Sequence, residues 1–147
     1  MTNVIITCNA GSSNTKLAVF AASSLECKTN AQTSSEAETL EWLHSVRENK
    51  IAAIGHRVVH GGDKFVRPTL ITPEVISELE KFIPLAPLHQ PVALKLITEV
   101  AKLYPDILQI ACFDTAFHHN MPELERRIPL SQNYYDNGIK RYGFHGL

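Results

Sequence analysis

The feature that most constrains the fold is a strand–turn–strand pattern at the N-terminus. An apolar run from Val4 to Cys8 is followed by a short polar segment, and a second apolar run covers Leu17 to Phe20. Two apolar runs joined by a turn rich in Gly, Ser and Asn are typical of a β-hairpin. We therefore expect the chain to begin with a hairpin that leads into a larger sheet.

The turn of this hairpin carries several groups that suit a phosphate. Residues 9–16 read Asn-Ala-Gly-Ser-Ser-Asn-Thr-Lys. Small residues let the backbone N–H groups approach an anion, and the ammonium of Lys16 neutralises its charge. The segment is not a Walker A loop, because the Gly-x-x-x-x-Gly-Lys-Ser/Thr spacing is absent and no helix follows. A phosphate site and an ordinary solvated turn both fit these residues.

Helical and strand patterns alternate through the rest of the chain. Their order, β-β-(β)-α-β-α-α-β, indicates an α/β fold with a mixed sheet and flanking helices. The expected elements are a short strand around 25–27, a helix over 36–49 that Ser35 opens with a capping box, a strand over 51–54 that ends at Gly55, a helix opened by Thr72 and Pro73, a helix over 91–104, a strand over 107–113, and a short helical stretch near 134–135 that Gly138 stops.

Composition excludes several classes of protein. The length of 147 residues and a hydrophobic content of 44% suit one soluble globular domain. The formal net charge is −1 and no run of Lys and Arg occurs, so nucleic acid is a poor partner. No segment approaches the ~20 apolar residues that span a bilayer, and the N-terminus lacks a basic secretory n-region. Cys8, Cys27 and Cys112 are expected to be reduced, buried thiols in a cytoplasmic protein.

Polar residues follow two of the expected strands, at the strand ends where ligands collect in α/β sheets. Arg57 is suited to hold a carboxylate or phosphate, although a surface ion pair also explains it. Asp114 is suited to catalysis or to Mg²⁺, although it could equally cap a turn. His56 and His60 are four residues apart, but the Val and Gly residues around them make a helix, and hence a helical metal pair, improbable.

With these residues in view, the chain resembles the acetate kinase family, which includes propionate and butyrate kinases. The resemblance covers essentially the whole chain in the family's order and rests on five blocks: Asn-Ala-Gly-Ser-Ser with Lys16 (residues 9–16), Gly-His-Arg-Val-Val-His-Gly-Gly (55–62), Leu-Ala-Pro-Leu-His (85–89), Phe-Asp-Thr-Ala-Phe-His (113–118) and Arg-Tyr-Gly-Phe-His-Gly (141–146).

The resemblance implies a ribonuclease-H-like domain of the actin, sugar-kinase and heat-shock-chaperone superfamily. It also implies ATP-dependent phosphorylation of acetate to acetyl phosphate, with Mg²⁺ as cofactor. The implied site residues are Asp114, His145 (a transition-state stabiliser) and His89 for catalysis, Arg57, Val59, Leu88 and Phe144 for the carboxylate and its acyl group, Lys16, Ser12 and Asn14 for the ATP phosphates, and Asn9 for Mg²⁺.

These roles agree with simple chemistry. Acetate has a pKa of about 4, like Asp or Glu, so it is already ionised at neutral pH. Catalysis then consists of positioning and charge neutralisation along an in-line phosphoryl transfer. Asp114 is accordingly expected to orient Mg²⁺ or the substrate, although a proton-transfer role is also open.

Two departures from the family pattern change the expectation. Asn14 replaces the third Ser of the hairpin turn, and the family's chain continues well beyond the block that ends this one. We therefore expect residues 1–147 to be the N-terminal acyl-substrate-binding domain without the nucleotide-binding domain, and to be inactive alone. The alternatives are a non-catalytic remnant, a subunit that needs a separately encoded C-terminal half, and a propionate or butyrate kinase. The family's own partner would be a second copy, in a homodimer.

Overall fold

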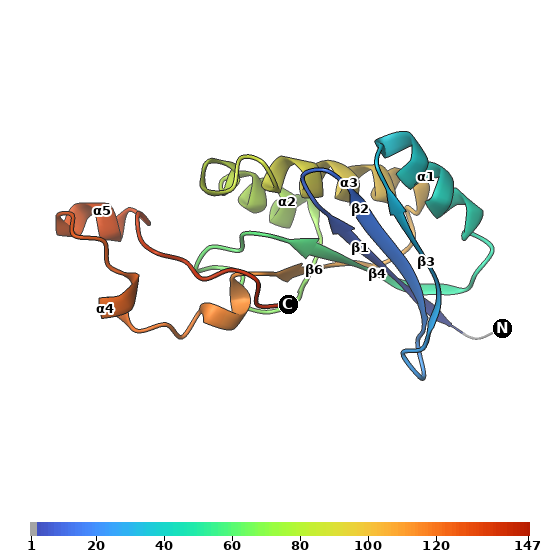
Figure 1. Ribbon diagram of the computed structural model, residues 1–147, viewed down its shortest axis with the longest axis horizontal. Helices are drawn as coiled ribbons and strands as arrows, with labels where there is room; N and C mark the ends of the chain where they lie inside the picture. Colours follow the sequence, from blue (N-terminus) through green and yellow to red (C-terminus); the bar gives the residue numbers. More distant parts are fainter. Residues whose placement is uncertain (1–2) are drawn as a thin grey trace.

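The computed structural model describes residues 3–147 and is built on a six-stranded mixed sheet (Figure 1). The strand order is β3-β2-β1-β4-β6-β5, with β1, β4 and β6 parallel and the remaining neighbours antiparallel. The expected N-terminal hairpin and the mixed α/β sheet are confirmed. The strands are β1 (Val4–Ala10), β2 (Thr15–Ala21), β3 (Cys27–Thr33), β4 (Ile51–Val58), β5 (Thr69–Leu70) and β6 (Gln109–Phe113).

Helices α1 (Glu36–Ser45), α2 (Pro73–Glu80) and α3 (Gln90–Leu103) cover one face of this sheet, as Figure 1 shows. Alternate residues of β1 are fully buried beneath them, including Ile6 and Cys8, while Ile5, Thr7 and Asn9 are half-buried on the opposite face. The helical elements are α1 (Glu36–Ser45), α2 (Pro73–Glu80), the 3₁₀ turn η1 (Ile83–Leu85), α3 (Gln90–Leu103), the 3₁₀ turn η2 (Ala116–His118), α4 (Glu123–Arg126) and α5 (Gln132–Asp136).

The helix starts agree with the sequence signals. The Ser35 hydroxyl accepts a hydrogen bond from the backbone N–H of Glu38 (3.2 Å), and the Thr72 hydroxyl accepts one from Val75 N–H (3.3 Å). The capping box differs from expectation in one detail. The Glu38 carboxylate bonds Ser34 N–H (2.8 Å), one residue before the N-cap, and this bond lowers the pKa of Glu38.

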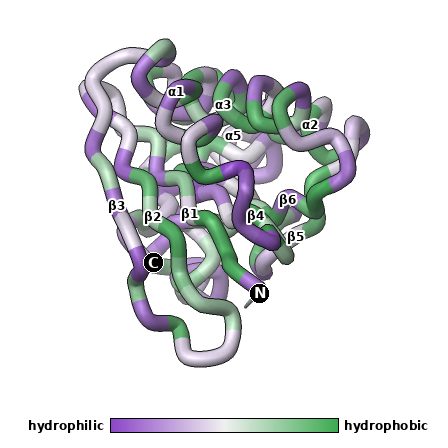
Figure 2. Tube along the Cα trace, turned by 90° about the vertical axis from the view of Figure 1, so that its right-hand side faces the viewer, coloured by the Kyte–Doolittle hydropathy of each residue, from purple (hydrophilic) through white to green (hydrophobic). Residues whose placement is uncertain are grey.

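Two strands extend well beyond the sequence prediction. Strand β4 does not end at Gly55 but continues to Val58, because it pairs with β1 through Arg57 and with β6 through Val58. Strand β3 runs over Cys27–Thr33 instead of stopping near Cys27, although most of its side chains are exposed and polar. It is an edge strand, and Figure 2 shows it mainly pale or purple beside the greener β2. Main-chain pairing with β2 is enough to order it.

The cysteine prediction is only partly right. Cys8 is buried, and burial raises the pKa of its thiol to about 12, but Cys27 is exposed on β3 and Cys112 is half-buried. All three are free thiols. Cys27 was expected to be buried from its apolar neighbour Leu25, but it lies on the edge strand, where few side chains meet a core.

After β6 the chain forms a C-terminal arm, residues 119–147, which extends away from the sheet and returns beside β6 (Figure 1). Its two limbs are joined by a hydrogen bond from Arg141 N–H to Arg126 O (2.8 Å). Gly138 follows α5 with φ of 85°, so the predicted Gly stop is confirmed. Within residues 3–147 no helix is long and apolar enough to cross a membrane.

Candidate active site

A cleft of about 590 Å³ opens where β4 and β6 end. Two separate stretches of chain, residues 85–89 and 144–145, meet there with the two strand ends, which is the position that the sequence predicted for a ligand. Seven of the expected site residues line this one cleft. The lining consists of Arg57, Val59, Leu85, Ala86, Pro87, Leu88, His89, Asp114, Phe144 and His145.

The polar floor of the cleft is a hydrogen-bonded cluster around Arg57. Its guanidinium donates from Nε to Asp114 Oδ1 (2.8 Å) and from Nη2 to Asp114 Oδ2 (2.5 Å). A third bond runs from Nη1 to Asn9 Oδ1 (3.0 Å). The carboxylate raises the pKa of Arg57, mainly through these hydrogen bonds and despite partial burial. Three of the five guanidinium N–H groups are thus committed to protein oxygens, which fixes the plane of the group.

The register of the sheet explains why these residues meet. Lys16 on β2 lies opposite Asn9 on β1, and Asn9 lies opposite Arg57 on β4. Laterally paired residues project from the same face, so the three side chains form a row on the face away from helices α1, α2 and α3. Lys16 is exposed and lines a shallow depression of about 370 Å³ with Asn9, outside the main cleft.

The apolar side of the cleft comes from segments far apart in the sequence. Val59 directly follows β4, Leu88 lies in the Pro-rich segment between η1 and α3, and Phe144 lies near the end of the arm. Leu88 is 71% exposed and Phe144 is 37% exposed, so this side is open to solvent. Pro84 lies in the 3₁₀ turn η1, and Pro87 lies in the short connection between η1 and α3, so no α-helix runs through this segment.

The end of the arm is seated on the strand end of β6. The backbone N–H of Gly146 donates to Asp114 O (3.1 Å), and a ring nitrogen of His118 is 2.9 Å from Phe144 O. A Cβ on Gly146 would lie 2.4 Å from Phe117 Cβ, so only glycine fits there. His145 has φ of 57°, a left-handed conformation uncommon for residues other than glycine. That backbone strain is held by the contacts on either side of it.

The two histidines of the 55–62 block have different positions. His56 points to the helix face, where its Nε2 is 2.7 Å from Gln109 Oε1, and burial lowers its pKa to about 4. His60 is fully buried. Neither lines the cleft; His56 lies on strand β4, and His60 lies in the loop that follows it. His89, by contrast, lies at the N-cap of α3 and lines the cleft.

Ser12 and Asn14 lie apart from the cleft. Both line a smaller depression of about 170 Å³ between the hairpin turn and the helices α1 and α3. The turn is closed by a hydrogen bond from Gly11 N–H to Asn14 O (2.8 Å). Of the three residues expected at the ATP phosphates, the structure therefore groups Ser12 with Asn14 and puts Lys16 beside Asn9.

Several residues around the cleft were not singled out from the sequence. Gln90 and Thr115 are buried, and each adjoins a cleft residue, His89 or Asp114. Gln90 accepts from His60 N–H (3.1 Å), and Thr115 Oγ1 accepts from Gly61 N–H (3.0 Å). The available signal was a polar residue directly beside a predicted site residue in an otherwise apolar context.

The residues expected near Mg²⁺ do not form a metal site by themselves. Both carboxylate oxygens of Asp114 and the amide oxygen of Asn9 accept hydrogen bonds from Arg57. Mg²⁺ requires a near-octahedral set of oxygens, and these oxygens already face a cation. Nor do residues 3–147 contain any group of three or more His, Cys, Asp or Glu side chains placed to hold a metal ion.

Curated relatives are similar in sequence to much of this chain. Acetate kinase from Rhodopseudomonas palustris is 50% identical over 107 residues, which is 72% of this chain and 27% of that protein. Acetate kinase from Sulfurovum is 53% identical over 98 residues, which is 66% of this chain and 25% of that protein. The chain thus matches about a quarter of the length of these relatives, in their N-terminal part.

Solved structures show the same fold over nearly the whole chain. Acetate kinase from Porphyromonas gingivalis superposes with a TM-score of 0.84 at 32% identity. A propionate kinase from Francisella tularensis superposes with a TM-score of 0.85 at 28% identity. Each alignment covers 98% of this chain and 45% of the other. The expected ribonuclease-H-like α/β domain, with its mixed sheet and flanking helices, is therefore confirmed. The model of the acetokinase family matches residues 37–147, three quarters of the sequence, and the chain belongs to that family.

Proposed function

We propose that this chain forms the carboxylate-binding wall of an ATP-dependent acetate kinase. Its reaction would be the reversible transfer of the γ-phosphoryl group of ATP to acetate, giving acetyl phosphate and ADP. Membership in the acetokinase family supports the reaction class. The chain covers less than half of the solved family chains, so the ATP site and the activity are proposed for a complete two-domain protein.

One observation supports the proposal most strongly, namely that the Arg57 guanidinium is fixed in place and still has unbonded N–H groups. Asp114 and Asn9 occupy three of its N–H groups, which leaves one on Nη1 and one on Nη2 without an acceptor among the described residues. Two such donors in a fixed plane suit the two oxygens of a carboxylate. The cleft around them is lined mainly by apolar side chains, which suits a short acyl group.

The proposed roles follow from this arrangement. Arg57 would hold the carboxylate or the phosphorylated product, and Val59, Leu88 and Phe144 would contact the acyl group. His145 would stabilise the charge of the transferring phosphoryl group, and His89 would line its path. Acetate arrives ionised, so no group has to remove a proton from it.

The nucleotide side is proposed to come from chain that lies outside these 147 residues. Lys16, Ser12 and Asn14 would approach the phosphates of ATP, while Asn9 would lie near Mg²⁺ carried on those phosphates. The cation would neutralise phosphate charge, and the residues here supply it no complete site. The missing half would belong to the same or a separate polypeptide, and the complete protein would pair with a second copy in the cytoplasm, where ATP is available.

A second candidate function is propionate kinase. The solved propionate kinase from Francisella tularensis matches the fold as well as the acetate kinase does. The open apolar side of the cleft offers room for an additional methylene group. One methylene is worth only ~1–3 kcal/mol of discrimination, so the two acids are expected to compete.

A chimaera tests the proposal directly. Residues 1–147 would be fused to the remaining part of Porphyromonas gingivalis acetate kinase, and acetyl phosphate would be trapped as its hydroxamate. We expect activity with acetate and ATP, and a loss of about 2–4 kcal/mol in kcat/KM on Arg57→Ala, from removal of a charge-assisted clamp. Arg67→Ala, an exposed arginine outside the cleft, is the matched control. A folded chimaera without activity, or a loss below threefold for Arg57→Ala, would refute the proposal.

A further inference from the structure

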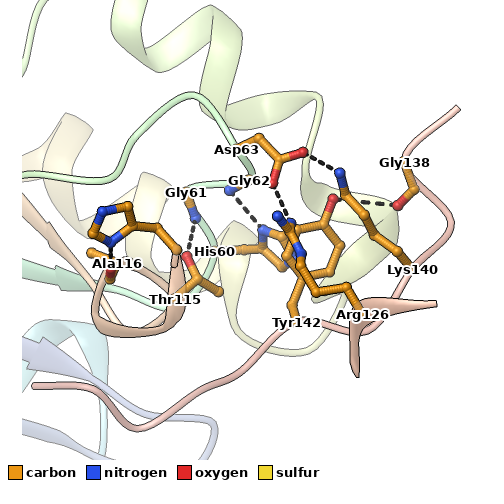
Figure 3. Close-up of polar contacts among 11 residues, drawn as sticks. His60, Gly61, Gly62, Asp63, Thr115, Ala116, Arg126, Gly138, Lys140 and Tyr142 are labelled. Atoms are coloured by element: carbon orange, nitrogen blue, oxygen red, sulfur yellow. Dashed lines mark hydrogen bonds and ion pairs between the residues drawn. The ribbon is translucent and has the colours of Figure 1, made fainter. Parts of the chain in front are cut away.

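Behind the cleft, one short loop bonds to several distant segments. This loop, residues 60–63, is the centre of Figure 3. Its backbone N–H groups donate from His60 to Gln90 Oε1 (3.1 Å), from Gly61 to Thr115 Oγ1 (3.0 Å) and from Gly62 to His60 Nδ1 (2.9 Å). Gln90 Nε2 also returns a bond to His60 O (3.0 Å). All five residues that form these bonds are buried.

The partners of the loop are neighbours of the cleft lining. Gln90 follows His89, Thr115 follows Asp114, and His60 itself follows Val59. The cleft residues just after β4, just after β6 and just before α3 (Val59, Asp114 and His89) are therefore each one residue away from the bonded loop or one of its partners. A shift of the loop would move three sides of the cleft together.

The imidazole of His60 also contacts the C-terminal arm, which forms the remaining side of the cleft. Its ring stacks on Phe82 with centroids 5.6 Å apart, and it meets Tyr142 edge-on at 4.5 Å and Phe144 edge-on at 5.6 Å. Phe144 lines the cleft, whereas His60 lies behind it. Aromatic pairs at these separations attract each other beyond the effect of area burial. The orientation of the Phe144 ring thus depends on the position of His60.

Hydrogen bonding fixes the tautomer of the His60 ring. Because Nδ1 accepts from Gly62 N–H, the proton of the neutral ring lies on Nε2. Nε2 is buried and has no hydrogen-bond partner among the described residues. Burial also lowers the pKa of His60, against the opposing charge of Asp63. A phenyl ring would fill this space without an unpaired donor, so packing alone does not account for a histidine there.

The same loop fastens the C-terminal arm. Asp63 accepts hydrogen bonds from Arg126 and from Lys140, both drawn in Figure 3. The two cations also lie over the ring of Tyr142, at 5.5 Å and 5.9 Å from its centroid. Tyr142 is in contact with His60, so the arm is tied to the loop through charge and through aromatic packing.

From these contacts we infer that His60 is a positioning residue, which sets the place of Phe144 and of the arm's end in the carboxylate cleft. It touches no substrate and acts through the rings of Tyr142 and Phe144. The inference rests on the proposed function insofar as the cleft binds a carboxylate. The attachment of the arm's end to the strand end of β6, however, can be measured without any ligand.

Two substitutions separate the functions of the ring. In His60→Asn, the side-chain oxygen takes the place of Nδ1 and still accepts from Gly62 N–H, but the ring contacts are lost. In His60→Phe, the ring stays and the acceptor is lost. His56→Asn is the matched control. His56 is buried like His60, but it lies on β4 and bonds to Gln109 away from the cleft.

Propionate titration and amide exchange, both followed by NMR on the 147-residue chain, are the readouts. We expect His60→Asn to weaken propionate binding about fivefold, as loss of aromatic contacts predicts. The Gly146 amide, which donates to Asp114 O, should exchange about tenfold faster as the arm's end loosens. His60→Phe should restore both to within about threefold, and His56→Asn should leave both within about twofold of the unchanged chain.

Several results would overturn the inference. Unchanged Gly146 exchange in His60→Asn, or an equal acceleration in His56→Asn, rules out a positioning role. If the unchanged chain binds no propionate, the second candidate function fails and titration with acetate tests the proposed function, while Gly146 exchange still decides the role of His60. Nuclear Overhauser contacts from the His60 ring to Tyr142 and Phe144 in the unchanged chain give a test that needs no variant, and their absence would also contradict the inference.

Discussion

Replacing Arg57 by Met removes the cation at the floor of the cleft and keeps most of its apolar stem. The two partners of this ion pair differ in exposure, since the side chain of Asp114 is 2% exposed and that of Arg57 is 27% exposed. Arg57→Met therefore leaves an ionised carboxylate buried without its cation. Asp114→Asn instead leaves a partly exposed guanidinium, which can turn towards water.

The expected magnitudes follow from that asymmetry. Breaking a buried pair by removing one partner costs about 3–5 kcal/mol in free energy of unfolding. Water can enter the space left by the partly exposed guanidinium, so we expect about 2–3 kcal/mol for Arg57→Met. For Asp114→Asn we expect about 1 kcal/mol, because the amide oxygen still accepts one hydrogen bond. Removing the charge of Arg57 is thus expected to lower the free energy of unfolding more than removing the charge of Asp114.

Urea unfolding at neutral pH measures both effects, with the fluorescence of Trp42 as the probe because it packs against the core between the sheet and α1. Lys102→Met is the matched control, since Lys102 forms an ion pair of similar length with Glu99 (2.7 Å) on the exposed side of α3. It should change stability by less than about 0.5 kcal/mol. A loss of less than about 1 kcal/mol for Arg57→Met, or a larger loss for Asp114→Asn, would refute the reasoning.

Three further predictions concern the same region. Burial lowers the pKa of His56 from 6.5 to about 4 on folding, so the unfolded chain binds more protons than the folded chain between these two pH values. The free energy of unfolding is therefore highest above pH 6.5 and falls by about 3 kcal/mol as the pH is lowered to 4. A His56→Gln variant should show a flatter dependence of stability on pH in urea titrations. Val59→Ala in the active chimaera should shift the ratio of kcat/KM from acetate towards propionate by about fourfold, the value of one buried methylene, and an unchanged ratio would mean that Val59 does not contact the acyl group. The 147-residue chain alone should make no acetyl phosphate from ATP and acetate, because holding both substrates in line is worth ~7–11 kcal/mol of the barrier; turnover within tenfold of a full-length family member would contradict this.

The elements with strong local signals were predictable from the sequence. The hairpin of β1 and β2 has two apolar runs around a polar turn, and its turn closes as expected. Helix α2 begins at Thr72 and Pro73, where the hydroxyl cap and the fixed φ of proline act within one turn. In both cases the decisive interactions join residues close in the chain, so the sequence pattern contains them.

The elements that were mispredicted depend on distant partners. Residues 56–58 look like a polar exit from a strand, yet they are held in β4 by β1 on one side and β6 on the other. Arg57 and Asp114 were each expected at a strand end, but their ion pair joins positions 57 residues apart and has no local signature. The bonds of the loop 60–63 to Gln90 and Thr115 are equally non-local. Tertiary pairing overrides local propensity at these positions.

The geometry also bears on the two roles left open for Asp114. A general base needs a free lone pair directed at the proton that it removes. Both oxygens of Asp114 instead accept from Arg57, and its backbone carbonyl accepts from Gly146 N–H. The arrangement therefore favours orientation, in which Asp114 holds the plane of Arg57 and, through its backbone, the end of the arm that carries His145.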